Sequence, residues 1–169
     1  MSLVLRIARA LALGIRTSKV PTGLTSLSKV HVAVVFLDAD EPGAEQLVSS
    51  IIQYFSAKKI RVEIFALTSV KGRPEIKGAH ILGPRNLTCI GRPRHNKRTP
   101  IVVLGEDLFI NLVSEGNFTA EYCAARSNAL FKVGRAASAK RIYNLFVSSD
   151  GHGAGDVFTQ ITGVLDTVK

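Results

Sequence analysis

The sequence contains no tryptophan, one methionine and only two cysteines among 169 residues. Cys89 and Cys123 stand apart from each other and from any CxxC or histidine-rich pattern. This spacing therefore indicates neither a disulfide framework nor a cysteine-based zinc site. Both cysteines are expected to be small core residues in a reducing compartment.

Long apolar runs are also missing, and the longest, within the first fifteen residues, is broken by Arg6 and Arg9. A helix that spans a bilayer needs roughly 20 apolar residues. We therefore expect a soluble mature chain. With 46% hydrophobic and 21% charged residues, its composition is that of a globular domain with one packed core.

Acidic residues are absent before Asp38, whereas basic residues begin early. Leucines and isoleucines alternate with arginines in a pattern that fits a helix, and Thr17 and Ser18 follow in a way similar to matrix-processing sites. These features predict an organellar presequence and a mitochondrial location, in the matrix or on the matrix face of the inner membrane. The alternative is an amphipathic first helix of a basic cytosolic protein. The candidate contacts of this arm are Arg6, Arg9, Arg16 and Lys19.

A second basic region lies between Lys71 and Arg98, where eight Lys and Arg residues face a single acid, Glu75. The net charge of +9 is thus concentrated in two regions, which favours a partner that carries phosphates. Pro93 and Pro100 stiffen the second region, and the absence of stacking aromatics favours contact with backbone phosphates over bases. A solvated loop is the alternative. The candidate phosphate-binding residues are Arg85, Arg92, Arg94, Lys97 and Arg98.

Strand and helix patterns alternate along the rest of the chain. Apolar or alternating runs predict strands at 31–39, 61–67, 79–83, 101–104, 108–113, 130–134 and 142–148. Helical spacing predicts helices from Asp40 with Pro42 in the first turn, after a cap at Asn117 or Thr119, and over the last sixteen residues. Together these patterns predict a three-layer α/β sandwich over 30–169, with a largely parallel sheet of five to six strands, and a basic amphipathic arm with its linker over 1–29.

Two loops that follow predicted strands carry polar residues where an α/β enzyme would bind its substrate. Asp38, Asp40 and Glu41 could hold a metal ion, but acids between a strand and a helix more often serve as capping groups. The glycine-rich loop 148–156 matches no phosphate-binding motif, and Asp156 is expected to cap the final helix. His152 has no evident nucleophile beside it. We therefore expect no catalytic residue, no cofactor and no metal.

The segment 106–168 contains "EDLFINLVSEGNFTAEYCAARSNALFKVGR" and later "YNLFVSSD" and "DVFTQITGVLDTV". It resembles an uncharacterised family of small bacterial α/β proteins in which a "DLLI-N" strand leads through a helix to a "KA-FKVG" segment. The resemblance implies a compact α/β domain and transfers no activity. A domain of this kind with an added basic arm is similar to lineage-specific subunits of mitochondrial ribosomes and respiratory complexes.

These observations predict a non-enzymatic structural subunit of the mitochondrial ribosome, which contacts rRNA phosphates and reaches neighbouring proteins through its N-terminal arm. The first alternative is an accessory subunit of an inner-membrane complex, such as the ATP synthase or a respiratory enzyme, whose basic surface faces anionic lipid. The second alternative is a matrix enzyme of α/β fold, which only the acidic and glycine-rich loops support.

Overall fold

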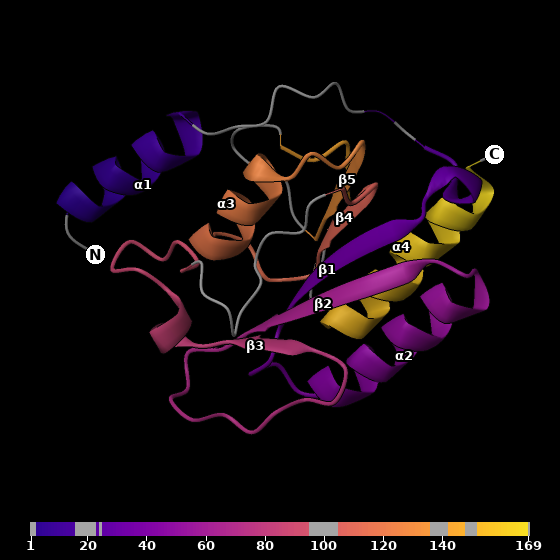
Figure 1. Ribbon diagram of the computed structural model, residues 1–169, viewed down its shortest axis with the longest axis horizontal. Coiled ribbons are helices and arrows are strands. Elements are labelled where there is room, and N and C mark those ends of the chain that lie inside the picture. Colours follow the sequence, from indigo (N-terminus) through magenta and orange to yellow (C-terminus); the bar gives the residue numbers. More distant parts are fainter. Residues whose placement is uncertain are drawn as a thin grey trace.

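The structure is a computed structural model of the chain (Figure 1) and describes residues 3–15, 23, 25–94, 105–135, 142–147 and 152–168. The strands of these residues are β1 (Val32–Asp38), β2 (Arg61–Leu67), β3 (His80–Leu82), β4 (Leu108–Asn111), β5 (Phe131–Gly134) and β6 (Leu145–Phe146). They form one sheet in the order β3-β2-β1-β4-β5-β6, in which every neighbouring pair is parallel. The expected α/β class and parallel sheet are confirmed.

Helices lie on both faces of the sheet (Figure 1). The α-helices of the described residues are α1 (Leu3–Ile15), α2 (Ala44–Ala57), α3 (Phe118–Arg126) and α4 (Ala154–Thr167). Short 3-10 helices span Leu27–Lys29 and Pro84–Asn86. The core under one face is shared by α2 and α4, and the core under the other by α3 and one residue of α1. The sheet is therefore the middle of three layers, as expected.

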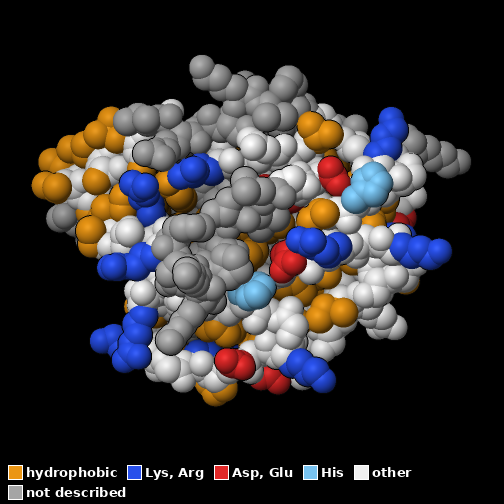
Figure 2. Space-filling view, viewed as in Figure 1, with side chains coloured by type: hydrophobic (Ala, Val, Ile, Leu, Met, Phe, Trp, Pro, Cys, Tyr) orange, Lys and Arg blue, Asp and Glu red, His pale blue; other side chains and the backbone are white. Residues whose placement is uncertain are grey.

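Helix α1 confirms the helical pattern of the first residues and packs outside α3 (Figure 1). Its Leu13 is buried in the α3-side core together with Phe118 and Tyr122. The space-filling view from the same side shows hydrophobic side chains gathered over α1, with Lys and Arg side chains along their border (Figure 2). The helix thus lies on the domain with one side and faces outward with the other.

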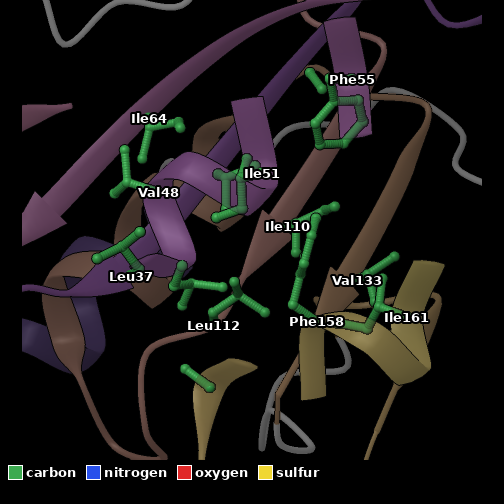
Figure 3. Close-up of a cluster of buried hydrophobic side chains, with 14 of the residues drawn as sticks. Leu37, Val48, Ile51, Phe55, Ile64, Ile110, Leu112, Val133, Phe158 and Ile161 are labelled. Atoms are coloured by element: carbon green, nitrogen blue, oxygen red, sulfur yellow. The ribbon is translucent and has the colours of Figure 1, made fainter. Parts of the chain in front are cut away.

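The two cores, one on each face of the sheet, explain why the sequences of β1 and β4 are almost continuously apolar. Strands covered by helices on both faces bury every side chain, so alternation with polar residues is lost. Ile110 of β4 and Val133 of β5 point toward Ile51 of α2 and Ile161 of α4 (Figure 3). On the opposite face, the rings of Phe36 and neighbouring phenylalanines stack at 5.1 and 5.3 Å between centroids.

The connections leave the sheet in opposite directions from its two central strands. The chain passes from β1 through α2 to β2 on one face, and from β4 through α3 to β5 on the other. In open α/β sheets, the carboxyl ends of two such strands border the crevice where ligands bind. The candidate functional regions are therefore this crevice and the basic surface around α1 and α3.

Several predicted boundaries differ from the structure. Helix α2 begins at Ala44 after Gly43, whose φ of 81° is left-handed, so Pro42 precedes the helix instead of occupying its first turn. Of residues 142–147, the described part of the predicted strand 142–148, only Leu145–Phe146 forms β6, because Ile142 packs into the α3-side core instead of extending the ladder. The predicted strand at 101–104 lies outside the described residues.

Two predicted helix caps have different outcomes. The side chain of Asn117 accepts a hydrogen bond from the backbone N–H of Ala120 and caps α3, as one of the two predicted candidates. The prediction of an Asp156 cap on α4 is wrong, because Gly153 occupies the N-cap. A carboxylate oxygen of Glu41, far away in the sequence, instead accepts from the N–H of Ala154 at 3.1 Å.

Candidate anionic-surface docking site

The two acid-poor basic regions of the sequence meet in space. The Nε of Arg9 in α1 donates a 3.0 Å hydrogen bond to the carbonyl of Ile90, 81 residues further along the chain. The guanidinium carbon of Arg9 lies 5.0 Å from the centroid of the Phe118 ring in α3. A cation over an aromatic face is attracted by the ring quadrupole. Helix α1 and the loop 83–94 therefore form one surface, with α3 as its base.

The loop 83–94 holds its arginines on a folded backbone. Leu87 and Pro93 pair in an isolated antiparallel bridge, and the N–H of Arg94 donates to the carbonyl of Asn86 at 2.7 Å. The side chain of Arg94 also returns to this turn, because its Nε donates to the carbonyl of Leu87 at 2.8 Å. Arg94 is nevertheless exposed, and its guanidinium group has further N–H donors besides the Nε–H that bonds to Leu87.

Gly91 allows this loop to approach α3 closely. Its φ is +90°, and a Cβ at this position would lie 3.2 Å from the ring of Phe118. The Oγ1 of Thr119 donates a 2.8 Å hydrogen bond to the carbonyl of Gly91. A larger residue would be strained by the backbone angle and would push the loop away from α3.

Tyr122 of α3 lies between two further arginines. The guanidinium carbon of Arg92 lies 5.5 Å from the centroid of its ring, and that of Arg126 lies 5.7 Å from it. Arg126 also donates to the Tyr122 hydroxyl at 3.0 Å. Aromatic rings of α3 thus hold arginine side chains from all three elements. We call this surface the basic face, and its residues are Arg6, Arg9, Arg85, Arg92, Arg94 and Arg126.

The basic face has little acidic compensation. Neither α1 nor the loop 83–94 contains an acid. The acid of α3 is Glu121, and burial, followed by the nearby charge of Glu115, raises the pKa of its carboxyl. Arg6, Arg85 and Arg94 are exposed. The exposed charged side chains of α1 and of the loop 83–94 are therefore cationic.

The structure describes five of the nine residues predicted to bind phosphate or to serve as arm contacts. Arg6, Arg9, Arg85, Arg92 and Arg94 all belong to the basic face. Lys97, Arg98, Arg16 and Lys19 lie outside the described residues.

Sequence reasoning missed the part that α3 plays. Phe118, Tyr122 and Arg126 recur every four residues and so lie along one side of α3. This spacing was the only sequence signal that the two rings share a surface with Arg126. It did not identify a binding surface, because two aromatic residues on one side of a helix more often pack into the hydrophobic core. Only the packing of α1 and the loop 83–94 onto α3 shows that these rings hold arginines.

An apolar stripe runs along the outward side of α1, next to the basic face. Leu3, Val4, Ile7 and Leu11 are 69%, 76%, 52% and 57% exposed. Positions four residues apart project from one side of a helix, so these side chains form a continuous strip. Soluble proteins seldom leave such a strip uncovered unless it contacts something. We call these four residues the α1 stripe.

The "FKVG" segment of the resemblance has a role in placing α3. Lys132 is buried, and its Nζ donates to the carbonyls of Ala124 and Ser127 at the end of α3, at 2.8 and 2.7 Å. The hydroxyl of Ser127 in turn donates to a buried carboxylate oxygen of Glu106. Burial lowers the pKa of Lys132, which the charge of Glu106 partly offsets. These contacts anchor α3, the base of the basic face, to the sheet.

The acids at the carboxyl end of β1 take part in bonds that shape the crevice. Asp40 accepts hydrogen bonds from the hydroxyl of Thr68 at 2.6 Å and from the N–H of Ser69 at 2.8 Å. Arg73 lies 3.3 Å from the same carboxylate. Asp38 accepts from the N–H of Asp40 at 2.8 Å. The prediction that these acids cap the following helix is wrong for α2, because its N-cap is Gly43 and no side chain caps it. Asp38 and Asp40 instead accept hydrogen bonds from donors of neighbouring loops.

Glu41 joins three elements at the crevice. Its second carboxylate oxygen lies 2.8 Å from a guanidinium nitrogen of Arg135, which follows β5. Arg135 is buried and also donates to the carbonyls of Leu112 and His152, at 3.2 and 2.8 Å. Together with the N–H of Ala154, these bonds fasten the start of α4 to the ends of β4 and β5.

A cavity of about 340 Å³ opens beside this ion pair, between the starts of α2 and α4. Asp38, Glu41 and Asp156 are among its lining residues, and their charge disfavours an anionic ligand. His152 lies 3.7 Å from Asp156 in an exposed pair and contacts no nucleophile among the described residues. Within the part of the chain that the structure describes, no group of three His, Cys, Asp or Glu residues could hold a metal ion.

The two cysteines differ from the expectation of a shared core role. Cys123 is half-buried against the α3-side core, and burial raises the pKa of its thiol to about 12. Cys89 is exposed on the loop 83–94, so the prediction of a core position for it is wrong.

Among the described residues, no helix combines the length and the apolarity that crossing a bilayer requires. Comparison with curated proteins and with solved structures finds no match to the chain. A family model does match, over residues 10–163, which include the second half of α1, the loop 83–94 and most of α4. Because this match covers most of the chain, the protein belongs to that family, which is described as a family of unknown function (DUF6913).

Proposed function

We propose that this protein is a non-enzymatic docking subunit, which attaches to a phosphate-bearing surface of a larger assembly through its basic face. The observation that carries the proposal is the contact of Arg9 with Ile90 and Phe118, because it joins two separate basic regions into one surface. A regional cluster of cations binds phosphates more strongly than the same charges spread over the protein.

The arginines are also held in position before any partner binds. Arg92 lies over Tyr122, and Arg94 is hydrogen-bonded to its own loop. Side chains ordered in advance lose less conformational entropy on binding. The planar guanidinium group donates several hydrogen bonds in a fork that suits phosphate oxygens. These properties support a built binding surface over a solvated loop.

The two predicted mitochondrial assemblies both present phosphates, on rRNA or on lipid headgroups. Membership of the mitochondrial ribosome or of an inner-membrane complex stays a prediction. The third prediction, a matrix enzyme, has less support, because the acids of the crevice bond to neighbouring loops and to Arg135.

The experiment compares two double variants with the wild-type chain on phosphocellulose, a phosphate-bearing matrix. Arg85→Glu with Arg94→Glu reverses two exposed charges of the basic face. The matched control, Lys29→Glu with Lys77→Glu, makes the same change of net charge on exposed residues outside the basic face. Both lysines lie near the core on the α2 side of the sheet, because Val30 belongs to that core and Gly78 lies next to Ile52 of α2. We expect the first variant to elute at clearly lower salt than the control.

Equal elution of the two variants would show that only net charge matters, and would contradict the proposal. A second measurement uses native extract of the source cells, fractionated by size. The wild-type chain and the control variant are expected in large complexes, and the basic-face variant among free proteins. Thermal unfolding of each variant verifies that the fold is intact.

A further inference from the structure

We propose that the phosphate-bearing surface is an anionic lipid bilayer, and that the α1 stripe inserts into its interfacial region. This inference rests on the proposed function and names the partner of the same face. It starts from the position of the α1 stripe on the side of the helix opposite Leu13 and Arg9, which hold α1 on α3. The stripe therefore faces outward while the helix remains attached to the domain.

The length of α1 suits a helix that lies in the membrane surface. Its 13 residues form a helix about 20 Å long, compared with a hydrocarbon core of about 30 Å. A short helix with an exposed apolar side and neighbouring cations binds in the plane of the interface, with its apolar side chains between the headgroups and the acyl chains. Leu3, Val4, Ile7 and Leu11 supply those apolar side chains.

The charges beside the stripe match the headgroups of anionic lipids. Arg6 belongs to the same helix and is exposed, and Arg85 and Arg94 are exposed on the adjoining loop. Figure 2 shows Lys and Arg side chains along the border of the hydrophobic patch over α1. When apolar residues enter the acyl boundary, cations at their border reach the level of the phosphates.

Other occupants fit the surface less well. RNA would neutralise the arginines but would leave the α1 stripe in water, because a phosphate backbone offers no apolar surface. A second copy could cover the stripe, but it would bring two cationic faces together and their like charges would repel. A bilayer with anionic lipids satisfies both the stripe and the arginines.

The test measures flotation of the full chain with lipid vesicles. One set contains only phosphatidylcholine, and the other contains roughly a third phosphatidylglycerol. We expect binding to the anionic vesicles and much weaker binding to the neutral ones. Ile7→Gln with Leu11→Gln removes half of the stripe without changing charge or helix propensity greatly, and should weaken vesicle binding by at least about tenfold.

The matched control replaces exposed valines elsewhere, Val70→Gln with Val164→Gln, and should bind vesicles as the wild type does. The stripe variant should still elute from phosphocellulose at the wild-type salt concentration. This outcome separates the two proposals, since loss of the stripe affects only the bilayer contact. The Arg85→Glu and Arg94→Glu variant should lose both activities.

Three results would overturn the lipid inference. The first is undiminished vesicle binding by the stripe variant. The second is a wild-type chain that ignores both kinds of vesicle but binds single-stranded or structured RNA. The third is a wild-type dimer without vesicle binding that the stripe substitutions convert into a monomer, which would assign the stripe to a second copy. The second result would leave the proposed function intact.

Discussion

Arg135, which is buried, and Glu41, which is half-buried, form an ion pair with a 2.8 Å separation at the carboxyl ends of the strands. The pair occupies the position where ligands bind in many open α/β sheets. Glu41 places its negative charge at the N-terminus of α4, where a bound anion would otherwise be favourable. In this protein the carboxylate of Glu41 thus takes the place that a bound anion would occupy, and Arg135 is its counter-ion.

Removal of Arg135 should destabilise the fold strongly. Arg135→Ala leaves Glu41 without its counter-ion and two carbonyls without a donor, so we expect the free energy of unfolding to fall by about 3 kcal/mol. Glu41→Gln should cost less, because the amide oxygen still accepts from Ala154. Urea unfolding measures both effects. As a control, Arg61→Ala removes an exposed partner of Glu63 and should cost under about 1 kcal/mol; an equal loss in Arg135→Ala and Arg61→Ala would contradict the role of the pair.

Asp40 should make the stability of the protein depend on acid. Burial acts to raise the pKa of Asp40, but hydrogen bonds from Thr68 and Ser69 and the charge of Arg73 outweigh it, so the pKa lies below its usual value of 3.8. A carboxyl whose pKa is lower in the folded chain stabilises the fold above pH 3.8, and this contribution is lost as the pH falls through the folded value.

The variant Asp40→Asn tests this dependence. It should be less stable than the wild type at neutral pH, and the difference should shrink as the pH falls below 3.8. Thermal unfolding between neutral pH and about pH 2.5 measures the effect in the window that the linkage defines. If the difference in stability between Asp40→Asn and the wild type stays constant over this pH range, the charge of Asp40 does not contribute to the stability of the fold.

The strands of the sheet could be predicted because burial on both faces leaves a mark in the sequence. Residues 32–37 are apolar throughout, and β1 lies between two layers of helices. The same signal failed at 142–148, where Ile142 is apolar because it packs under α3 and not because it extends β6. Hydrophobicity records burial, and the partner that buries a residue is decided by the tertiary fold.

The candidate site was predictable only in part for a related reason. The density of positive charge in the sequence identified Arg9, Arg92 and Arg94 as candidates, but it did not identify the side chains that they contact. The rings of Phe118 and Tyr122 could not be assigned to these arginines from spacing alone, because the contacts join residues far apart in the sequence. Likewise, the cap on α4 comes from Glu41, more than a hundred residues earlier, and not from the nearby Asp156.

Gly91 should be required for the close contact of the loop 83–94 with α3. The alanine of Gly91→Ala would be strained by the φ of +90°, and its Cβ would lie only 3.2 Å from the ring of Phe118. We therefore expect the free energy of unfolding to fall by about 1–2 kcal/mol. Gly116→Ala is the control, because its φ is +79° but its Cβ would enter open space. Gly91→Ala should lose more stability and should also elute earlier from phosphocellulose; identical behaviour of the two variants would show that the contact is loose.

The two thiols should react at very different rates. Cys89 is exposed, whereas burial raises the pKa of the Cys123 thiol to about 12, so little reactive thiolate forms there near neutral pH. Iodoacetamide followed by mass spectrometry should modify Cys89 in the native chain and Cys123 only after unfolding. Rapid modification of Cys123 in the native chain would show that its thiol is accessible and would contradict its burial.

Arg9 should hold α1 on the domain. Arg9→Ala removes both the hydrogen bond to Ile90 and the contact with Phe118, which together are worth on the order of 1–2 kcal/mol. Amide hydrogen exchange should therefore accelerate about tenfold in α1, while β1 keeps its protection. Arg6→Ala is the matched control on the same helix, since Arg6 is exposed. Equal amide protection of α1 in both variants would show that Leu13 and its apolar neighbours hold the helix without Arg9. The contact between the two basic regions would then have another cause.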